Sequence, residues 1–249
     1  DFFVIKIATG FYDNPSLGRP SSNGVMVVFS ATSGEPVALL KDEGWLTDMR
    51  TGIGGAITTI ELAPNNAKNV LLIGTGLQCR FQADCLSRLS PDIYQYSVWG
   101  RSLRNAKKAC EDLSSKGLDI KPATDLEEGV KKADIIITTT PSTEHIVRNS
   151  WVSASTHITA IGADSLGKQE LDTDLLHRAD LLVSDLNSQS LDHGEFQSIK
   201  ETRSALSPIE IGNIFNKTEG GRLSEESVTI ADLTGIAPQD IAITGTVLL

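Results

Sequence analysis

The chain has 249 residues, of which 40% are hydrophobic, and a formal net charge of −10. This length allows one large or two modest domains, and the acidic balance argues against a non-specific nucleic-acid surface. No apolar run approaches the length of a membrane span, and no secretory leader is visible. The three cysteines lack ligand-like spacing, which predicts reduced thiols, no metal site and a cytoplasmic protein. They are Cys79, Cys85 and Cys110.

The N-terminal part of the chain predicts a strand, a hairpin and a helix. An apolar strand around Lys6 opens the chain without an initiator methionine, so we expect that upstream sequence is missing. Runs at residues 24–31 and 36–40 flank a turn-forming cluster, which predicts an antiparallel hairpin. Residues 43–62 have helical periodicity, with three glycines shortly after Arg50. Glycines inside a helix indicate close packing or ligand approach, and Arg50 would suit a carboxylate unless it is an ordinary surface arginine.

Residues 69–78 carry the most informative motif. A short aliphatic run ends at Gly74, Gly76 follows two residues later, and a helical pattern opens behind it. In a dinucleotide-binding fold the first glycine permits a tight turn, and the second lets the backbone approach a pyrophosphate at the positive end of the helix. A third glycine is absent near Arg80. Because Gly-x-Gly alone is weak evidence, the interpretation depends on the surrounding elements.

Strand and helix patterns alternate after this motif. Further strands are predicted at residues 96–99, 135–139, 157–161 and 181–184, and helices at residues 103–116, 125–132 and 171–178. Such alternation implies a parallel sheet with helices on both faces, which is a Rossmann-type domain with its core at residues 63–191.

The flanking segments predict a second domain. A strand at residues 228–233 and a helix from Pro238 onward follow the Rossmann core, and we group both with the N-terminal hairpin. The expected fold is therefore α/β, with a Rossmann-type domain inserted in an α+β domain built from both chain ends. The outer limits that we set are residues 63–234 for the nucleotide domain, which include the strand at residues 228–233, and residues 1–62 plus 235–249 for the second domain.

The end of the second Rossmann strand indicates which cofactor is preferred. An NAD site usually places Asp or Glu there to bind the ribose hydroxyls. This chain instead has Arg101 and Ser102, and a guanidinium with a hydroxyl suits a 2′-phosphate. We therefore predict NADP, with NAD possible. The alternative is that Arg101 is only a solvated residue at the end of a strand.

Polar clusters follow three other strands, at residues 138–141, 162–165 and 185–188. Open parallel sheets bind ligands outside the carboxyl ends of their strands. Asp164 follows its strand at a glycine-containing turn, where a carboxylate could act as a general base on an amine or imine. The alternative is an Asp that only caps a helix or a turn.

Five separated motifs, at residues 46–52, 74–78, 161–172, 194–195 and 232–240, resemble the ornithine cyclodeaminase/mu-crystallin family in their order. The resemblance covers nearly the whole chain. It implies Lys6 and Asp164 as catalytic residues, and Lys6 and Arg50 as substrate-binding residues. The implied cofactor-binding residues are Thr51, Gly74, Thr75, Gly76, Leu77, Gln78, Arg101, Ser102, Thr139, Thr140, Gly162, Thr234 and Gly235.

The chain also departs from the family pattern. The family normally has roughly sixty or more residues before the Lys6 strand, which fits its two-domain size. A further substrate-contacting arginine belongs to that segment. Leu166 replaces the usual proline of the Asp164 motif.

The resemblance implies an NAD(P)-dependent dehydrogenase or imine reductase that acts on the α C–N bond of a small amino or imino acid. One alternative is a cyclodeaminase-type ammonia-lyase that uses NAD catalytically. Another is a non-catalytic, mu-crystallin-like protein that binds NADPH or a small molecule. The resemblance further implies a homodimer formed through the sheet of the second domain.

Overall fold

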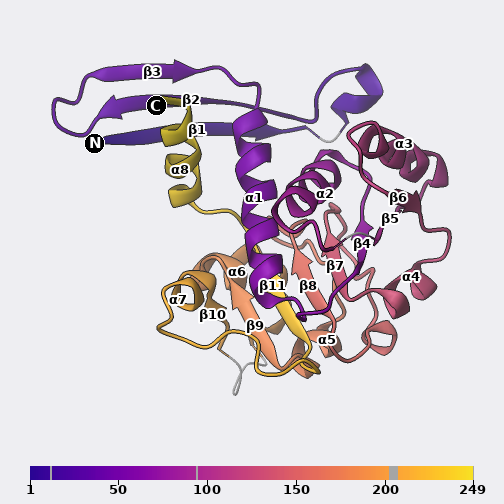
Figure 1. Cartoon of the computed structure of the whole chain (residues 1–249). Coiled ribbons are helices and arrows are strands. Elements are labelled where there is room, and N and C mark those ends of the chain that lie inside the picture. Colours follow the sequence, from indigo (N-terminus) through magenta and orange to yellow (C-terminus); the bar gives the residue numbers. More distant parts are fainter. Residues whose placement is uncertain (12, 94, 202–206, 249) are drawn as a thin grey trace. The chain divides into compact units, whose positions relative to one another are not determined.

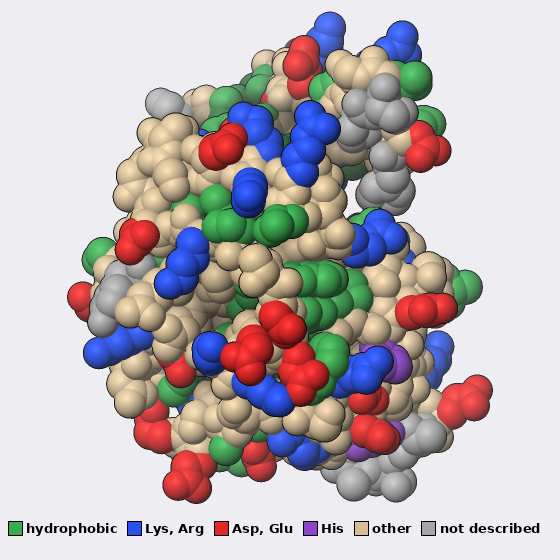
Figure 2. Space-filling view, turned by 90° about the vertical axis from the view of Figure 1, so that its right-hand side faces the viewer, with side chains coloured by type: hydrophobic (Ala, Val, Ile, Leu, Met, Phe, Trp, Pro, Cys, Tyr) green, Lys and Arg blue, Asp and Glu red, His purple; other side chains and the backbone are tan. Residues whose placement is uncertain are grey.

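The computed structural model describes residues 1–11, 13–93, 95–201 and 207–248. It falls into two compact units (Figure 1), the first made of residues 1–51 and 236–249 and the second of residues 52–235. None of the described helices is both long and apolar enough to span a membrane. On the face drawn in Figure 2, acidic and basic side chains are interspersed over the surface.

The first unit contains a three-stranded antiparallel sheet and one complete helix. Its strands follow the order β1-β2-β3, and residues 31–35 connect the last two, which form the predicted antiparallel hairpin. Gly34 adopts a φ of +73°, a left-handed conformation that glycine adopts without strain. The elements are β1 (Phe2–Gly10), η1 (Asn14–Leu17), β2 (Ser22–Ser30), β3 (Pro36–Leu40) and α8 (Ala237–Leu248).

The two faces of this sheet differ in burial. Met26 and Val28 are buried on the face that α8 covers, where the Thr244 hydroxyl lies 3.4 Å from the sulfur of Met26. The opposite face of β1 is apolar and exposed, because alternate residues of a strand point to opposite sides. Ile5 on this face is 50% exposed, and Leu39 of β3 is 63% exposed.

The second unit contains an eight-stranded sheet in which all pairings are parallel, in the order β10-β9-β11-β8-β7-β4-β5-β6. The strands are β4 (Asn69–Ile73), β5 (Gln95–Trp99), β6 (Ile120–Pro122), β7 (Ile135–Thr138), β8 (His157–Ala160), β9 (Leu181–Ser184), β10 (Ile209–Glu210) and β11 (Thr229–Asp232). The helices are α2 (Leu77–Leu89), α3 (Leu103–Ser114), α4 (Leu126–Lys132), α5 (Thr173–Arg178), α6 (Asn187–His193) and α7 (Ile211–Phe215), with the short turns η2 (Asn149–Trp151) and η3 (Glu195–Ile199).

Apolar cores lie on both faces of the parallel sheet. Leu182 and Ile230 pack into a cluster with side chains of α4 and α5. Their strand neighbours Leu181 and Ala231 point the other way, into a cluster with α7. Burial on both faces explains why these strands read as continuous aliphatic runs rather than alternating ones.

The fold class predicted from the sequence is confirmed, whereas one grouping was wrong. The strand at residues 228–233 is β11, which lies inside the parallel sheet between β9 and β8 and not with the chain ends. Its four residues are all buried, as a central parallel strand requires. The sequence prediction also omitted β6 and β10, two short strands at the edges of this sheet.

Helix α1 (Trp45–Leu62) belongs partly to each unit, since the division falls between Thr51 and Gly52. The boundary that the sequence predicts, at residues 62/63, coincides with the end of this helix and stays a prediction. Two of its glycines face α2 at very short distance. A Cβ atom on Gly55 would lie 2.0 Å from the Gln82 side chain, and one on Gly52 would lie 3.0 Å from the Phe81 carbonyl oxygen. Close packing of helices therefore accounts for these two glycines.

Candidate active site

The carboxyl ends of six parallel strands lie in one row. The aligned residues, in sheet order, are Ser184, Asp232, Ala160, Thr138, Ile73 and Trp99. Predicted cofactor-binding residues lie one or two positions beyond five of these six strand ends. The sheet register thus brings together at one edge loops that are up to about 160 positions apart in the chain, which is where open parallel sheets bind ligands.

The turn after β4 has the geometry that a pyrophosphate requires. Gly74 has a φ of +122°, and a Cβ atom there would lie 2.4 Å from the Thr139 hydroxyl. Gly76 is the N-cap of α2 and has no side-chain cap, and a Cβ there would meet nothing within 4 Å. Open space therefore adjoins the first N–H groups of a 13-residue helix, an environment that favours an anion. These residues fit a dinucleotide phosphate.

Arg80 supports this turn from within α2. Its guanidinium donates to the carbonyl oxygens of Thr75 at 2.7 Å and Gly76 at 2.9 Å, and it pairs with Asp112 at 2.7 Å. The long side chain near the position of the third fingerprint glycine therefore braces the turn. Nearby Cys79 is buried, and burial raises the pKa of its thiol to about 12, so it is an unreactive structural thiol.

The loop after β5 carries the predicted adenosine contacts. A Cβ on Gly100 would lie 2.5 Å from the Thr75 side chain, so this loop packs tightly on the glycine turn. Ser102 caps α3, because its hydroxyl accepts from the Asn105 N–H at 3.4 Å. Arg101 is exposed and has no ion pair among the described residues.

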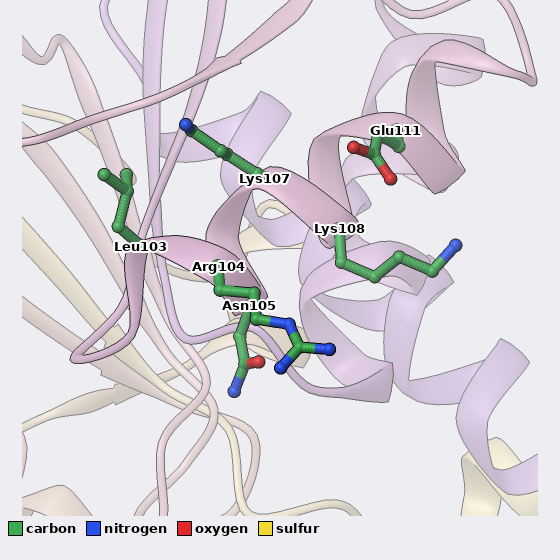
Figure 3. A pocket seen from close by; sticks show the side chains of 6 residues that line it. All are labelled: Leu103, Arg104, Asn105, Lys107, Lys108 and Glu111. Atoms are coloured by element: carbon green, nitrogen blue, oxygen red, sulfur yellow. The ribbon is translucent and has the colours of Figure 1, made fainter.

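A hollow on the surface of α3 continues this basic region. Figure 3 shows Arg104, Lys107 and Lys108 projecting from one helix, together with Glu111. Lys108 pairs with Asp112 at 2.7 Å, whereas neither Arg104 nor Lys107 forms an ion pair within the described part of the chain. Unneutralised cations are therefore concentrated beside Arg101 in a protein whose net charge is −10.

A buried carboxylate links the loops after β7 and β8. Glu170 accepts from the Thr140 N–H at 2.6 Å, the Thr140 hydroxyl at 2.7 Å and the Gly162 N–H at 2.9 Å. A second buried acid, Glu195, accepts from the Glu170 N–H at 2.9 Å and the Leu171 N–H at 2.7 Å. Burial raises the pKa of both carboxyl groups.

Two further acids lie beneath the loop after β11. Asp185 accepts from the Thr234 N–H at 3.2 Å and from the Gly235 N–H at 2.6 Å, which fixes the predicted cofactor loop. Asp232 is fully buried and accepts from Ser190 and from the Phe196 N–H. Burial raises the pKa of Asp232 to about 7.

Asp164 lies on the loop after β8 with its side chain 47% exposed. Lys168 pairs with its Oδ1 at 2.5 Å, and Ser165 donates to the same oxygen at 3.1 Å. Gln197 fixes this loop, since it accepts from the Gly167 N–H at 2.8 Å and donates to the Lys168 carbonyl at 3.1 Å. A solvent-accessible carboxylate held by a cation can exchange protons with a bound molecule.

Lys6 and Arg50 meet in the first unit around a third residue, Asp240 of α8. The Lys6 ammonium lies 2.8 Å from Asp240 Oδ1, and Arg50 Nε lies 3.2 Å from the same oxygen. Arg50 Nη1 also donates to Gln239 Oε1 at 2.8 Å. The nearby Thr51 hydroxyl donates to the Thr47 carbonyl at 2.8 Å.

The structure therefore brings the predicted residues together in two groups. The loops at the sheet edge form one group, and Lys6 with Arg50 forms the other. The convergence of Asp164 with Lys6 and Arg50 stays a prediction, because these residues belong to different units. Sequence reasoning assigned no role to the residues that hold these groups, which are Arg80, Glu170, Asp185, Glu195, Asp232, Gln239 and Asp240. Most of them lie inside the motifs of the resemblance, which was the available signal.

Comparisons with known proteins agree with this architecture. An uncharacterized cyclodeaminase of Sinorhizobium fredii is 39% identical over 246 residues, covering 97% of this chain and 74% of its own length. The solved structure of an archaeal alanine dehydrogenase dimer with bound NAD has a TM-score of 0.91 and 32% identity, over 99% of this chain and 76% of that one. The pyrroline-2-carboxylate reductase of Thermococcus litoralis, solved with NADH and L-proline, has a TM-score of 0.89 and 28% identity, over 98% and 76% of the two chains.

The matched regions include both units of the fold. The model of the ornithine cyclodeaminase/mu-crystallin family matches residues 1–248. The chain therefore belongs to the ornithine cyclodeaminase/mu-crystallin family.

Proposed function

We propose that this protein is a nicotinamide-dependent dehydrogenase or imine reductase that acts on the α C–N bond of a small amino or imino acid. The observation that carries the proposal is the open, uncapped start of α2 behind Gly74 and Gly76 at the carboxyl edge of a parallel sheet. Similar solved structures include dehydrogenases and reductases that contain NAD or NADH. The unit of residues 52–235 would bind the cofactor, and the other unit would bind the substrate.

Each predicted residue has a separate task in this mechanism. A bound nicotinamide supplies or accepts the hydride at the substrate α-carbon. Arg50 binds the substrate carboxylate and so orients the α-carbon. Lys6 and Asp164 exchange the proton of the substrate nitrogen, which gains a proton when the C=N bond is reduced and loses it in the reverse direction.

We further propose that NADP is preferred. Arg101, Ser102 and the neighbouring cations of α3 offer positive charge and a hydroxyl where an NAD site usually has a carboxylate. The 2′-phosphate would neutralise part of this charge. Arg101 and Arg104 form no ion pair within the described residues, which supports this preference.

The cyclodeaminase reaction is the second candidate, because an uncharacterized cyclodeaminase is among the relatives and a lysine cyclodeaminase is among the similar structures. A dehydrogenase and a cyclodeaminase both begin by oxidising the amine at the α-carbon to an imine, and an imine reductase catalyses the reverse of this step. They differ in the outcome, since a cyclodeaminase releases ammonia and regenerates its cofactor without net redox change.

We also propose a homodimer formed through the exposed apolar face of the β1-β2-β3 sheet. The similar alanine dehydrogenase structure is described as a dimer. Contiguous exposed apolar surface of this kind marks an interaction site in most proteins.

The decisive experiment measures absorbance at 340 nm with NADPH or NADH and a panel of substrates. The panel contains pyrroline-2-carboxylate, another cyclic ketimine, pyruvate with ammonia, and ornithine. Steady NADPH oxidation with an imino acid is the expected result, and Asp164→Asn should lower kcat at least tenfold with little change in cofactor binding. Ammonia release from ornithine without net oxidation would indicate the cyclodeaminase. Tight NADPH binding without any turnover would indicate a binding protein.

A further inference from the structure

We propose that Asp240 is a positioning residue that holds Lys6 and Arg50 together as one carboxylate-binding pair, a role that rests on the function proposed above. The three residues come from β1, α1 and α8, and Lys6 and Asp240 are 234 positions apart in the chain. A single oxygen, Asp240 Oδ1, lies 2.8 Å from the Lys6 ammonium and 3.2 Å from Arg50 Nε.

Burial makes this bridge effective. The side chains of Arg50 and Asp240 are each 12% exposed, and that of Lys6 is 18% exposed, so solvent screens their charges only weakly. Two cations that both lie within about 3 Å of one oxygen are close enough to repel each other unless that oxygen carries negative charge. Asp240 removes that repulsion, and the trio keeps one net positive charge, which is the complement of one substrate carboxylate.

The neighbouring Gln239 fixes the orientation of the guanidinium. Arg50 Nη1 donates to Gln239 Oε1 at 2.8 Å, whereas Nε lies 3.2 Å from Asp240 Oδ1 as an ion pair without a hydrogen bond. Within the described residues Nη2 makes no hydrogen bond, so one nitrogen of the planar fork remains for a ligand. Successive residues of α8 thus set both the distance and the direction of the Arg50 side chain.

Asp240 also opposes the loss of charge on Lys6. Burial is the main cause that lowers the pKa of Lys6, and the Arg50 charge adds to it. The hydrogen bond that Lys6 donates to Asp240 and the charges of Asp240 and Asp42 act in the opposite direction and raise the pKa. Without the Asp240 carboxylate, a larger fraction of Lys6 would be neutral at pH 8.

The experiment compares the full-length wild type with Asp240→Asn in two measurements. The first is the KM for the imino acid of the highest activity in the panel, which we expect to rise at least tenfold while the Kd for the cofactor changes less than twofold. The second needs no turnover. Competitive labelling with acetic anhydride at pH 8, analysed by mass spectrometry, should show Lys6 reacting severalfold faster relative to exposed Lys217 in the variant.

Two further variants separate positioning from folding. Thr246→Ala lies on the same helix, where its hydroxyl bonds only the Ile243 carbonyl among the described residues, and it should leave both readouts unchanged. Gln239→Leu removes the Nη1 contact and keeps the Asp240 charge, so it should raise KM without faster Lys6 labelling. If Asp240→Asn does not fold, the KM of Gln239→Leu tests whether contacts from α8 position Arg50.

Unchanged Lys6 labelling in folded Asp240→Asn would overturn the proposal, as would an unchanged KM in Asp240→Asn or in Gln239→Leu. Wild-type protein without turnover on any substrate would overturn the proposed function instead. The labelling result would then decide alone whether Asp240 controls the charge of Lys6.

Discussion

Single carboxylates organise the candidate cofactor edge of this protein. Glu170, Asp185, Glu195 and Asp232 are all buried, and the first three accept backbone N–H groups from loops at the sheet edge. The loops have no neighbouring strand to accept hydrogen bonds from these N–H groups, so the carboxylates accept them instead. These acids fix the loops at a cost in stability, because a buried carboxylate loses hydration.

The contribution of the buried Asp232 to the free energy of unfolding depends on pH. Burial raises its pKa from 3.8 to about 7, so the native state binds the proton more tightly than the unfolded chain. The stabilisation is complete below pH 3.8 and is lost as pH rises through about 7. Asp232→Asn removes this titration. We expect its free energy of unfolding, relative to the wild type, to rise by on the order of 2 kcal/mol between pH 5 and pH 8.

Urea denaturation at the two pH values measures this difference. Asp119→Asn, at an exposed carboxylate, is the control and should change little between them. Equal behaviour of the two variants would show that Asp232 titrates as it does in the unfolded chain.

Arg101 gives a test of the cofactor preference. Arg101→Asp removes a cation and adds a carboxylate that repels a 2′-phosphate. We expect the Kd for NADPH to rise on the order of 100-fold, and that for NADH to change only slightly. Fluorescence titration measures the Kd of each variant for both cofactors. Lys217→Asp is the control, because it makes the same charge change at another exposed residue. An equal effect on NADPH and NADH would make Arg101 an ordinary surface residue.

At the scale of elements, α1 depends on glycines where it faces α2. A Cβ on Gly55 would lie 2.0 Å from the Gln82 amide, whose residue is fully buried. Gly55→Ala should therefore lower the free energy of unfolding by about 1–3 kcal/mol, although alanine is the better helix former. Gly212→Ala in α7 is the matched control, since its Cβ would meet nothing within 4 Å. Thermal denaturation of both variants measures the difference, and equal stability would contradict the close packing.

Local patterns predicted most elements, because each strand of a parallel sheet and each amphipathic helix has its own periodicity. They predicted the strand β11 but did not place it in the parallel sheet, since pairing is a long-range property and α7 is followed by a long irregular segment that interrupts the alternation. They also failed for β6, which has three residues and ends in Pro122. The site shows the same limit. Lys6 and Arg50 could be selected by their chemistry and by resemblance, whereas the Asp240 bridge depends on the packing of three distant segments.

At the scale of the whole molecule, the exposed face of the first unit's sheet leads to a prediction about assembly. Ile5 points to the opposite side of β1 from Lys6, so Ile5→Lys alters the apolar face and not the charge cluster. We expect the wild type to sediment as a dimer and Ile5→Lys as a monomer, because a buried unpaired lysine strongly disfavours the interface. Leu223→Lys, at another exposed leucine, should remain dimeric. A dimeric Ile5→Lys protein would place the interface elsewhere.

The division of the chain into units has a consequence for its synthesis. Residues 52–235 are continuous, so the ribosome delivers every strand of the parallel sheet before it reaches α8. The hairpin is synthesised well before residues 236–249, which contain α8. Because translation adds about 5–20 residues per second, β1 and β2 spend many seconds with both apolar faces uncovered. The nascent hairpin is therefore the segment that a chaperone would have to shield, and the charge cluster of Lys6, Arg50 and Asp240 is completed only after α8 has been synthesised.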